Sequence, residues 1–174
     1  MDAKVLLCDF AEVSGGKLFI SGAGIGVLAS ATPSPPLRTS VSLAVLVMLG
    51  VEDTDTPHKM TIELVYTAGA NETRVLLNDE LPPDADPADR GMILAQFMVP
   101  RSPQMSGEDE LTLPMAIPLF GLPLPQVGLY YFSVRVDGRE MDRATFRAIV
   151  QPPQGPEAVA AGPGASDGAS EPSL

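Results

Sequence analysis

The stretch from Gly128 to Val150 constrains the fold most, because its sequence has the pattern of a β-hairpin. Apolar and polar residues alternate as far as Val136, as in a strand whose successive side chains point to opposite sides of a sheet. Asp137-Gly138 then provides a tight turn, since glycine tolerates the positive φ that such turns require. We expect the following residues to face inward: Tyr130, Phe132, Val134, Val136, Ala144, Phe146, Ala148 and Val150. A β-sandwich commonly ends with such a hairpin, so the pattern favours an all-β fold.

Further strand patterns occur along the chain. Ser14-Gly15-Gly16 separates Ala3–Val13 from Lys17–Gly24 and predicts a second hairpin. Thr39–Leu49 begins as an alternation and becomes continuously apolar, which is typical of a central strand covered on both faces. The other predicted strands are Lys59–Thr67, with Met60, Ile62, Leu64 and Tyr66 inward, Thr73–Asn78, Met92–Val99 and Leu111–Ile117. Together they predict an antiparallel β-sandwich of eight or nine strands, immunoglobulin-like or jelly-roll, over residues 1–150.

Two proline-rich segments are not predicted as strands. Pro118–Gly128 loses a backbone donor at each proline, so we expect it to cross the mouth of the sandwich in an extended path. Its apolar residues would either cap the core or form an interaction surface. They are Leu119, Phe120, Leu122 and Leu124. Residues 151–174 consist mainly of Pro, Gly, Ala and Ser with three acidic residues, a composition that predicts a disordered tail.

Composition excludes several classes of function. The chain has 11 basic and 22 acidic residues, a formal charge of −11, and no cluster of Lys and Arg. Binding to nucleic acid or to an anionic membrane surface is therefore not expected. The longest apolar run, Val41–Val51, is about half as long as a membrane span, and the N-terminus does not resemble a signal peptide. These features predict a cytoplasmic protein.

No enzymatic site is predicted. Cys8 is the only cysteine and lies in an apolar run, so we expect a buried thiol rather than a nucleophile. His58 is the only histidine, and its position after Pro57 suggests an exposed loop. The sequence has no GxSxG motif that could supply a serine nucleophile for His58. A zinc site needs several His or Cys ligands, and the chain has one of each. We therefore expect neither catalytic residues nor a cofactor.

Acidic loops leave open a second class of function, a calcium- or carbohydrate-binding module. Sandwich proteins can collect calcium ligands from loops at one end, although no loop here has the DxDxDG spacing. The acidic residues are Glu52, Asp53 and Asp55, then Asp84, Asp86 and Asp89, then Glu108, Asp109 and Glu110. The preferred prediction is a protein-interaction module, because small β-sandwiches usually act through loops and sheet edges. Its candidate surfaces are Pro118–Pro125, Asp84–Asp89 and Arg101–Glu110.

Two motifs lie at the ends of the predicted domain, LLCDFAEVSGGKLFISGAG near the start and LPLPQVGLYYFSVRVDG near the end. They resemble those of an uncharacterised family of small bacterial and phage proteins, and the resemblance covers Ala3–Gly24 and Leu122–Phe146. An aromatic residue often follows the first glycine-rich turn in such openings, whereas this chain has Ile25-Gly26. The resemblance implies a shared fold and no catalytic residues, and it suggests a phage or phage-defence context for an unidentified protein partner.

Overall fold

The structure, a computed structural model, describes residues 1–30, 34–77 and 91–151. The predicted tail at 151–174 therefore lies, apart from its first residue, outside the described residues. The chain is all-β, as the alternation predicted, with eleven strands in the described part rather than eight or nine. The elements are β1 (Asp2–Cys8), β2 (Phe10–Ser14), β3 (Lys17–Ser21), β4 (Val27–Ser30), β5 (Leu37–Leu49), η1 (Val51–Asp53), β6 (His58–Ala68), β7 (Asn71–Val75), β8 (Met92–Phe97), β9 (Leu111–Leu124), β10 (Gly128–Val136) and β11 (Arg139–Val150).

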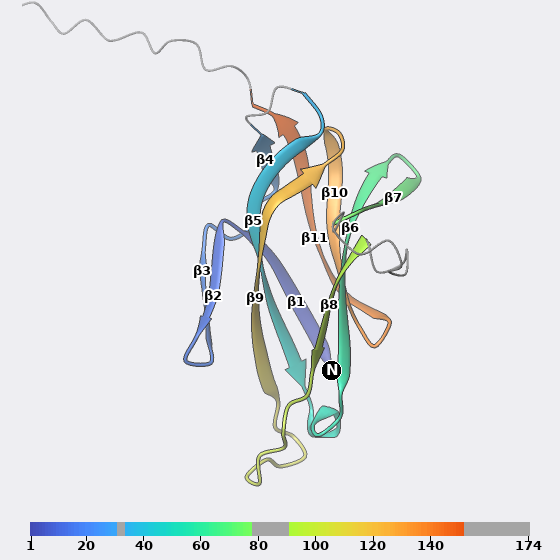
Figure 1. The fold of residues 1–174 in the computed structure, drawn as a ribbon. Coiled ribbons are helices and arrows are strands. Elements are labelled where there is room, and N and C mark those ends of the chain that lie inside the picture. Colours follow the sequence, from blue (N-terminus) through green and yellow to red (C-terminus); the bar gives the residue numbers. More distant parts are fainter. Residues whose placement is uncertain (31–33, 78–90, 152–174) are drawn as a thin grey trace, which may run out of the picture.

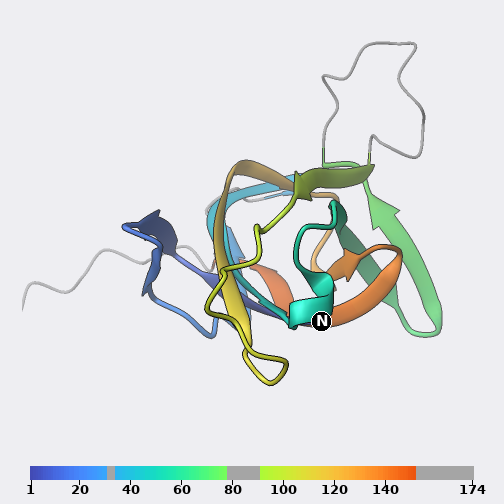
Figure 2. The ribbon, with the colours of Figure 1, turned by 90° about the horizontal axis from the view of Figure 1, so that it is seen from below.

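The strands form three sheets (Figure 1). The first has the order β1-β5-β9, so the apolar strand β5 is central, as predicted. The second has the order β4-β11-β10-β6-β7, and β8 also pairs with β6. All of these pairs are antiparallel except β4 with β11, which is parallel. The third sheet is the small hairpin β2-β3, which projects from the side of the molecule (Figures 1 and 2).

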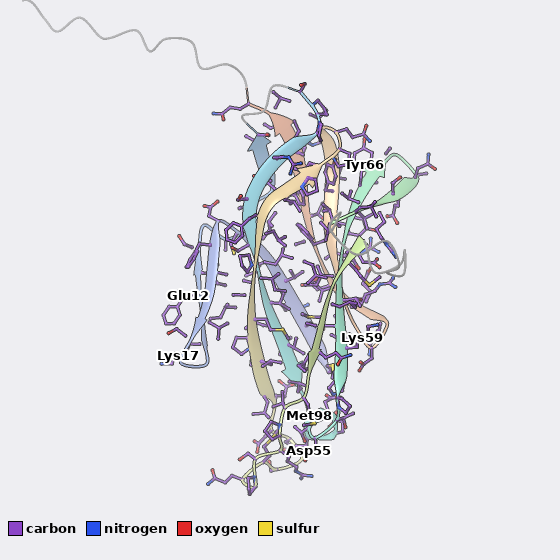
Figure 3. All side chains as sticks on the ribbon, in the orientation of Figure 1. Glu12, Lys17, Asp55, Lys59, Tyr66 and Met98 are labelled. Atoms are coloured by element: carbon purple, nitrogen blue, oxygen red, sulfur yellow. The ribbon has the colours of Figure 1, made fainter. Side chains whose placement is uncertain are left out.

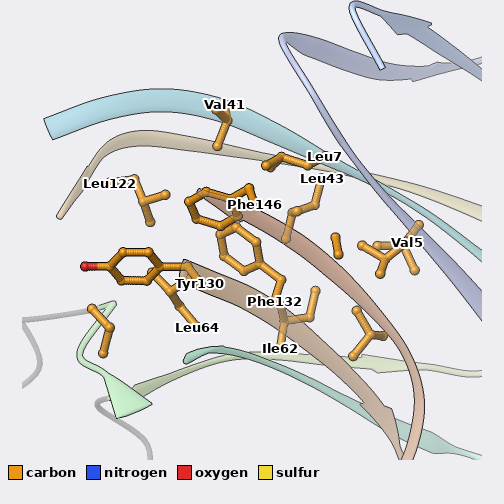
Figure 4. Close-up of a cluster of buried hydrophobic side chains, with 14 of the residues drawn as sticks. Val5, Leu7, Val41, Leu43, Ile62, Leu64, Leu122, Tyr130, Phe132 and Phe146 are labelled. Carbon is orange, nitrogen blue, oxygen red and sulfur yellow. The ribbon is translucent and has the colours of Figure 1, made fainter. Parts of the chain in front are cut away.

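The two larger sheets share one hydrophobic core (Figure 4). β10 and β11 contribute its aromatic centre, where the Phe146 ring lies 5.5 Å from that of Tyr130 and 5.7 Å from that of Phe132. β1 and β5 add aliphatic side chains from the first sheet, among them the fully buried Leu43. The residues predicted to face inward on β10, β11 and β6 are buried or pack against this core. A backbone-to-side-chain hydrogen bond also joins the sheets, since the Val5 amide donates to Asp142 Oδ2 at 3.0 Å.

The prediction for Pro118–Gly128 was wrong, because most of this segment belongs to the long strand β9, which pairs with β5 as far as Leu124. β9 is an edge strand, and its free side needs no donors. Successive N–H groups of a strand point to opposite sides, so residues four apart point to the same side. Pro114 and Pro118 therefore lack their N–H groups on one side of β9. The pairing shifts by one residue between Thr39 and Val41, which brings Pro123 onto that side as well. The prolines therefore fit β9 because they face away from β5.

The predicted strand Ala3–Val13 divides at Asp9 into two strands of different sheets. β1 stays paired with β5 up to Cys8, and β2 then turns away to pair with β3. Gly22, with a φ of +65°, closes the base of the hairpin, and a Cβ there would clash with the Asp9 carboxylate. The turn itself uses Gly15 and Gly16, both with positive φ, as the sequence predicted. The result is a separate two-stranded element.

Candidate functional site

The predicted interaction residues of β9 do not gather on one surface. Leu122 and Leu124 are 3% and 1% exposed and belong to the core, Leu119 packs against that core, and Phe120 is 84% exposed. The cause is a bulge at Phe120 and Gly121, where Gly121 has a φ of +61° and the strand alternation reverses. Leu122 and Leu124 therefore point inward like Leu119. Asp84, Asp86 and Asp89 lie outside the described residues.

Three acidic side chains of the described loops accept hydrogen bonds from backbone amides. Asp53 Oδ2 accepts from the Gly50 amide at 2.9 Å, and Asp55 Oδ1 accepts from the Arg101 amide at 3.0 Å. Asp109 Oδ2 accepts from Ser106 at 2.7 Å in the same way, which lowers the pKa of its carboxyl group. Within residues 1–30, 34–77 and 91–151, no three His, Cys, Asp or Glu side chains are grouped so that they could hold a metal ion.

His58 is buried rather than exposed, so its predicted position was wrong. It begins β6, and Nδ1 lies 2.7 Å from Asp137 Oδ2 while Nε2 lies 2.8 Å from the Asp53 carbonyl oxygen. Both partners are acceptors, so both ring nitrogens donate only when the imidazole is protonated. Burial lowers the pKa of His58, but the two hydrogen bonds and the neighbouring carboxylates outweigh it and leave that pKa above its usual value. The two acceptors therefore favour the protonated ring over the neutral one.

A polar cleft lies on the outer face of the second sheet. Four neighbouring strands line it, and its volume is about 230 Å³. Its charged and hydroxyl-bearing residues are Glu63 from β6, Glu72 and Arg74 from β7, Tyr131, Ser133 and Arg135 from β10, and Glu140 and Arg143 from β11. Alternation on β10 explains this composition, because Tyr130, Phe132 and Val134 point into the core. The residues that alternate with them, Tyr131, Ser133 and Arg135, point outward into the cleft.

Most of these cleft residues are paired. Arg74 Nη2 lies 2.7 Å from Glu63 Oε1, and the Glu63 side chain is only 12% exposed. Arg143 donates to both oxygens of Glu140, at 2.7 and 3.1 Å, and these bonds lower the pKa of the Glu140 carboxyl group. The Arg143 guanidinium also lies 4.4 Å from the centre of the Tyr131 ring.

Two further contacts complete the paired part of the cleft. Ser133 donates to Glu140 Oε2 at 2.8 Å, and burial together with a hydrogen bond to Glu72 raises the pKa of Tyr131. Arg135 differs from its neighbours, because its buried Nε has no hydrogen-bond partner among the described residues. The sequence placed Tyr131, Ser133 and Arg135 on one face, but the strand order that brings the other charges beside them had no sequence signal.

The hairpin β2–β3 carries the second candidate site. Phe10 and Phe19 lie on its face away from the first sheet and are 53% and 51% exposed. Its other face packs through Ala11 and Leu18 against Ala116 and neighbouring residues. Figure 3 shows Glu12 and Lys17 on this projecting element, at the side of the molecule. The hairpin therefore holds two aromatic side chains in solvent on a defined backbone.

The hairpin covers the first sheet incompletely. A mainly apolar cleft of about 360 Å³ remains between the tip of the hairpin and the outer face of β5 and β9. Leu18 and Ile20 line it from the hairpin, and Leu46 and Pro114 line it from the sheet. Apolar surface is thus available on both faces of β2–β3. Sequence analysis missed this site, although Phe10 and Phe19 were visible in the hairpin pattern.

The chain was compared with family models, curated proteins and solved structures. The model of a family of unknown function (DUF6941) matches residues 4–149, from β1 to the end of β11. No curated protein and no solved structure matches the chain. The described part of the chain has no helix with the length and apolar character that crossing a membrane requires.

Proposed function

The chain belongs to this family of unknown function, and we propose that it is a non-enzymatic protein-binding module that contacts its partner through the β2–β3 hairpin. The observation that carries the proposal is the exposure of Phe10 and Phe19 on the outer face of the hairpin. Aromatic side chains on a defined backbone are typical anchors of protein interfaces, because they bury much apolar area at little entropic cost. A partner with an apolar groove would receive both rings.

The incomplete packing of the hairpin also supports this role. A two-stranded sheet is marginally stable alone, and β2–β3 covers the first sheet only in part, through Ala11 and Leu18. A partner that covers the outer face would add the packing that the hairpin lacks. Exposed apolar patches on soluble proteins commonly mark such contact sites.

Two observations favour binding over catalysis. Both ring nitrogens of His58 are already engaged, so the ring offers no free base to a substrate. Burial and the charge of Asp9 raise the pKa of the Cys8 thiol, which makes it a poor nucleophile at neutral pH. The carbohydrate- and calcium-binding alternatives have no specific observation in their favour.

We further infer the organisation of the protein from these features. Residues 1–150 would act as one sandwich-type domain, which the core shared by the two larger sheets supports. Residues 151–174 would be a disordered extension, as their composition indicates. A cytoplasmic location fits a single cysteine that is buried and free.

Replacement of both exposed rings tests the proposed function. Phe10→Ser/Phe19→Ser should keep the thermal stability of the wild type within a few degrees, because both rings are half exposed. A photo-cross-linking residue placed at Lys17 should trap a specific partner in native cell extract, and the double substitution should abolish that cross-link. Phe120→Ser is the matched control, since it removes an exposed ring outside the hairpin. Equal cross-linking by the double variant would overturn the proposal.

A further inference from the structure

Arg135 lines the polar cleft, which lies on a different sheet from the hairpin. Its Nε is buried and has no partner in the part of the chain that the structure describes. An unsatisfied buried donor is costly, and a cation is more costly than a neutral amide. An acceptor that entered the cleft would relieve this cost. The free energy of binding would therefore include the relief of this cost in addition to the new hydrogen bonds.

The other cleft residues do not supply this acceptor. Glu63 is paired with Arg74, and both oxygens of Glu140 accept from Arg143. Glu140 Oε2 also accepts from Ser133. These ion pairs hold the side chains around Arg135 in place. Among the three arginines of the cleft, Arg135 is the one whose guanidinium has no ion pair with a carboxylate of the described residues. The acceptor must therefore come from outside this group.

The chemistry of the cleft selects the class of ligand. A planar guanidinium matches a carboxylate, which can accept two parallel N–H bonds. Arg74 and Arg143 neutralise Glu63 and Glu140, so Arg135 and Glu72 remain as one positive and one negative charge in the cleft. This pair of opposite charges suits a carboxylate together with an ammonium group better than a doubly charged phosphate. The volume of about 230 Å³ equals that of about eight water molecules at roughly 30 Å³ each. The charges and the volume of the cleft together fit a small zwitterion.

We propose that this cleft is a binding site for a free α-amino acid, whose carboxylate pairs with Arg135 and whose ammonium group lies toward Glu72. Arg135 supplies the counter-charge for the carboxylate, and Glu72 is the glutamate of the cleft that forms no ion pair with an arginine among the described residues. The Tyr131 ring and the Arg143 guanidinium stack on each other and form part of the wall. The proposal does not depend on the hairpin or on a protein partner.

Ligand titrations on the full chain test this site. The probes are L-alanine and L-leucine, acetate as the carboxylate alone, ethylamine as the ammonium alone, and inorganic phosphate, all at constant ionic strength. One or both amino acids should raise the Tm by roughly 5 °C at a concentration 100-fold above Kd, and acetate should do so less. Ethylamine and phosphate should have no comparable effect. A larger shift with phosphate would overturn the assignment to an amino acid.

Two variants separate specific binding from general stabilisation by solutes. Arg135→Met removes the proposed anchor and should abolish the amino-acid shift, while its own Tm stays equal to or above that of the wild type because an unsatisfied donor is lost. Arg139→Gln makes the same change in net charge outside the cleft and should bind like the wild type. An equal shift in Arg135→Met, or no calorimetric heat with any amino acid in the wild type, would refute the site.

Discussion

His58 and Asp137 are 79 residues apart in the sequence, and their side chains meet with Nδ1 and Oδ2 at 2.7 Å. Asp137 forms the turn between β10 and β11 with a φ of 51°, and its Oδ1 also accepts from the Lys59 amide at 2.9 Å. The Asp137 amide donates to the Lys59 carbonyl oxygen at 2.9 Å. The contact therefore joins the last hairpin to the start of β6. It also makes the stability of this end of the fold depend on pH.

Unfolding should become easier as the pH rises through the pKa of His58 in the folded state. That pKa is raised above 6.5, so the stabilisation is complete below about pH 6.5 and is lost as the ring deprotonates at higher pH. We expect a loss of about 1 kcal/mol between pH 6 and pH 8.5, because Nε2 then no longer donates to the Asp53 carbonyl. Urea titrations over this range measure the effect.

His58→Gln is the control for this pH dependence, since its side chain can hydrogen-bond but does not titrate. Its free energy of unfolding should be lower than that of the wild type at pH 6 and nearly flat up to pH 8.5. The measured pH range ends below the pKa of Cys8, which is raised by burial and by Asp9, so the thiol does not contribute to the pH dependence. A wild type and a variant with parallel pH profiles would show that His58 is not charged in the fold.

Local patterns determined much of the fold. The Gly128–Val150 hairpin, the central position of β5 and the inward residues of β6 all follow from alternation and turn chemistry. The path of β9 did not, because the effect of a proline depends on whether its strand is at an edge. That property belongs to the sheet and has no signal in the segment itself. The bulge at Gly121 likewise depends on the pairing with β5.

The candidate sites were less predictable than the fold, for a related reason. The polar cleft needs β7 and β11 beside β10 and β6, and sequence separation says nothing about that order. His58 has its carboxylate partner 79 residues away. The exposure of Phe10 and Phe19 depends on the turn of the chain at Asp9, which sends the hairpin away from β5. Each site is thus a product of non-local pairing.

Tyr130→Phe should destabilise the turn before β10. The buried Tyr130 hydroxyl donates to the Gln126 carbonyl oxygen at 2.6 Å and accepts from the Gln126 amide at 3.2 Å. Loss of both bonds should cost about 1–2 kcal/mol. Tyr66→Phe is the matched control, because the Tyr66 ring lies 5.0 Å from that of Tyr130 and its hydroxyl makes no hydrogen bond among the described residues. Equal losses in the two variants, measured by urea unfolding, would contradict this account.

Gly128→Ala should be among the most damaging glycine substitutions. Gly128 has a φ of +145°, and an added Cβ would lie 2.7 Å from Tyr66 Cε2, so the ring would have to move out of the core. We expect a loss of about 3 kcal/mol from the clash and the backbone strain. Gly26→Ala meets no atom within 4 Å and should change stability by less than about 0.5 kcal/mol. Thermal melts that rank the two variants in the opposite order would refute the explanation.

Pro118→Val should increase self-association without loss of the fold. Pro118 is exposed on the edge strand β9, and valine would restore an N–H on the side that faces away from β5. Free donors on an edge strand can pair with another chain, which proline prevents. Light scattering at increasing protein concentration should show larger species for this variant than for the wild type. Thr112→Val, on the same face of β9, adds apolar surface but no donor, and should scatter like the wild type. Equal association by both variants would assign the effect to apolar surface and not to the restored donor.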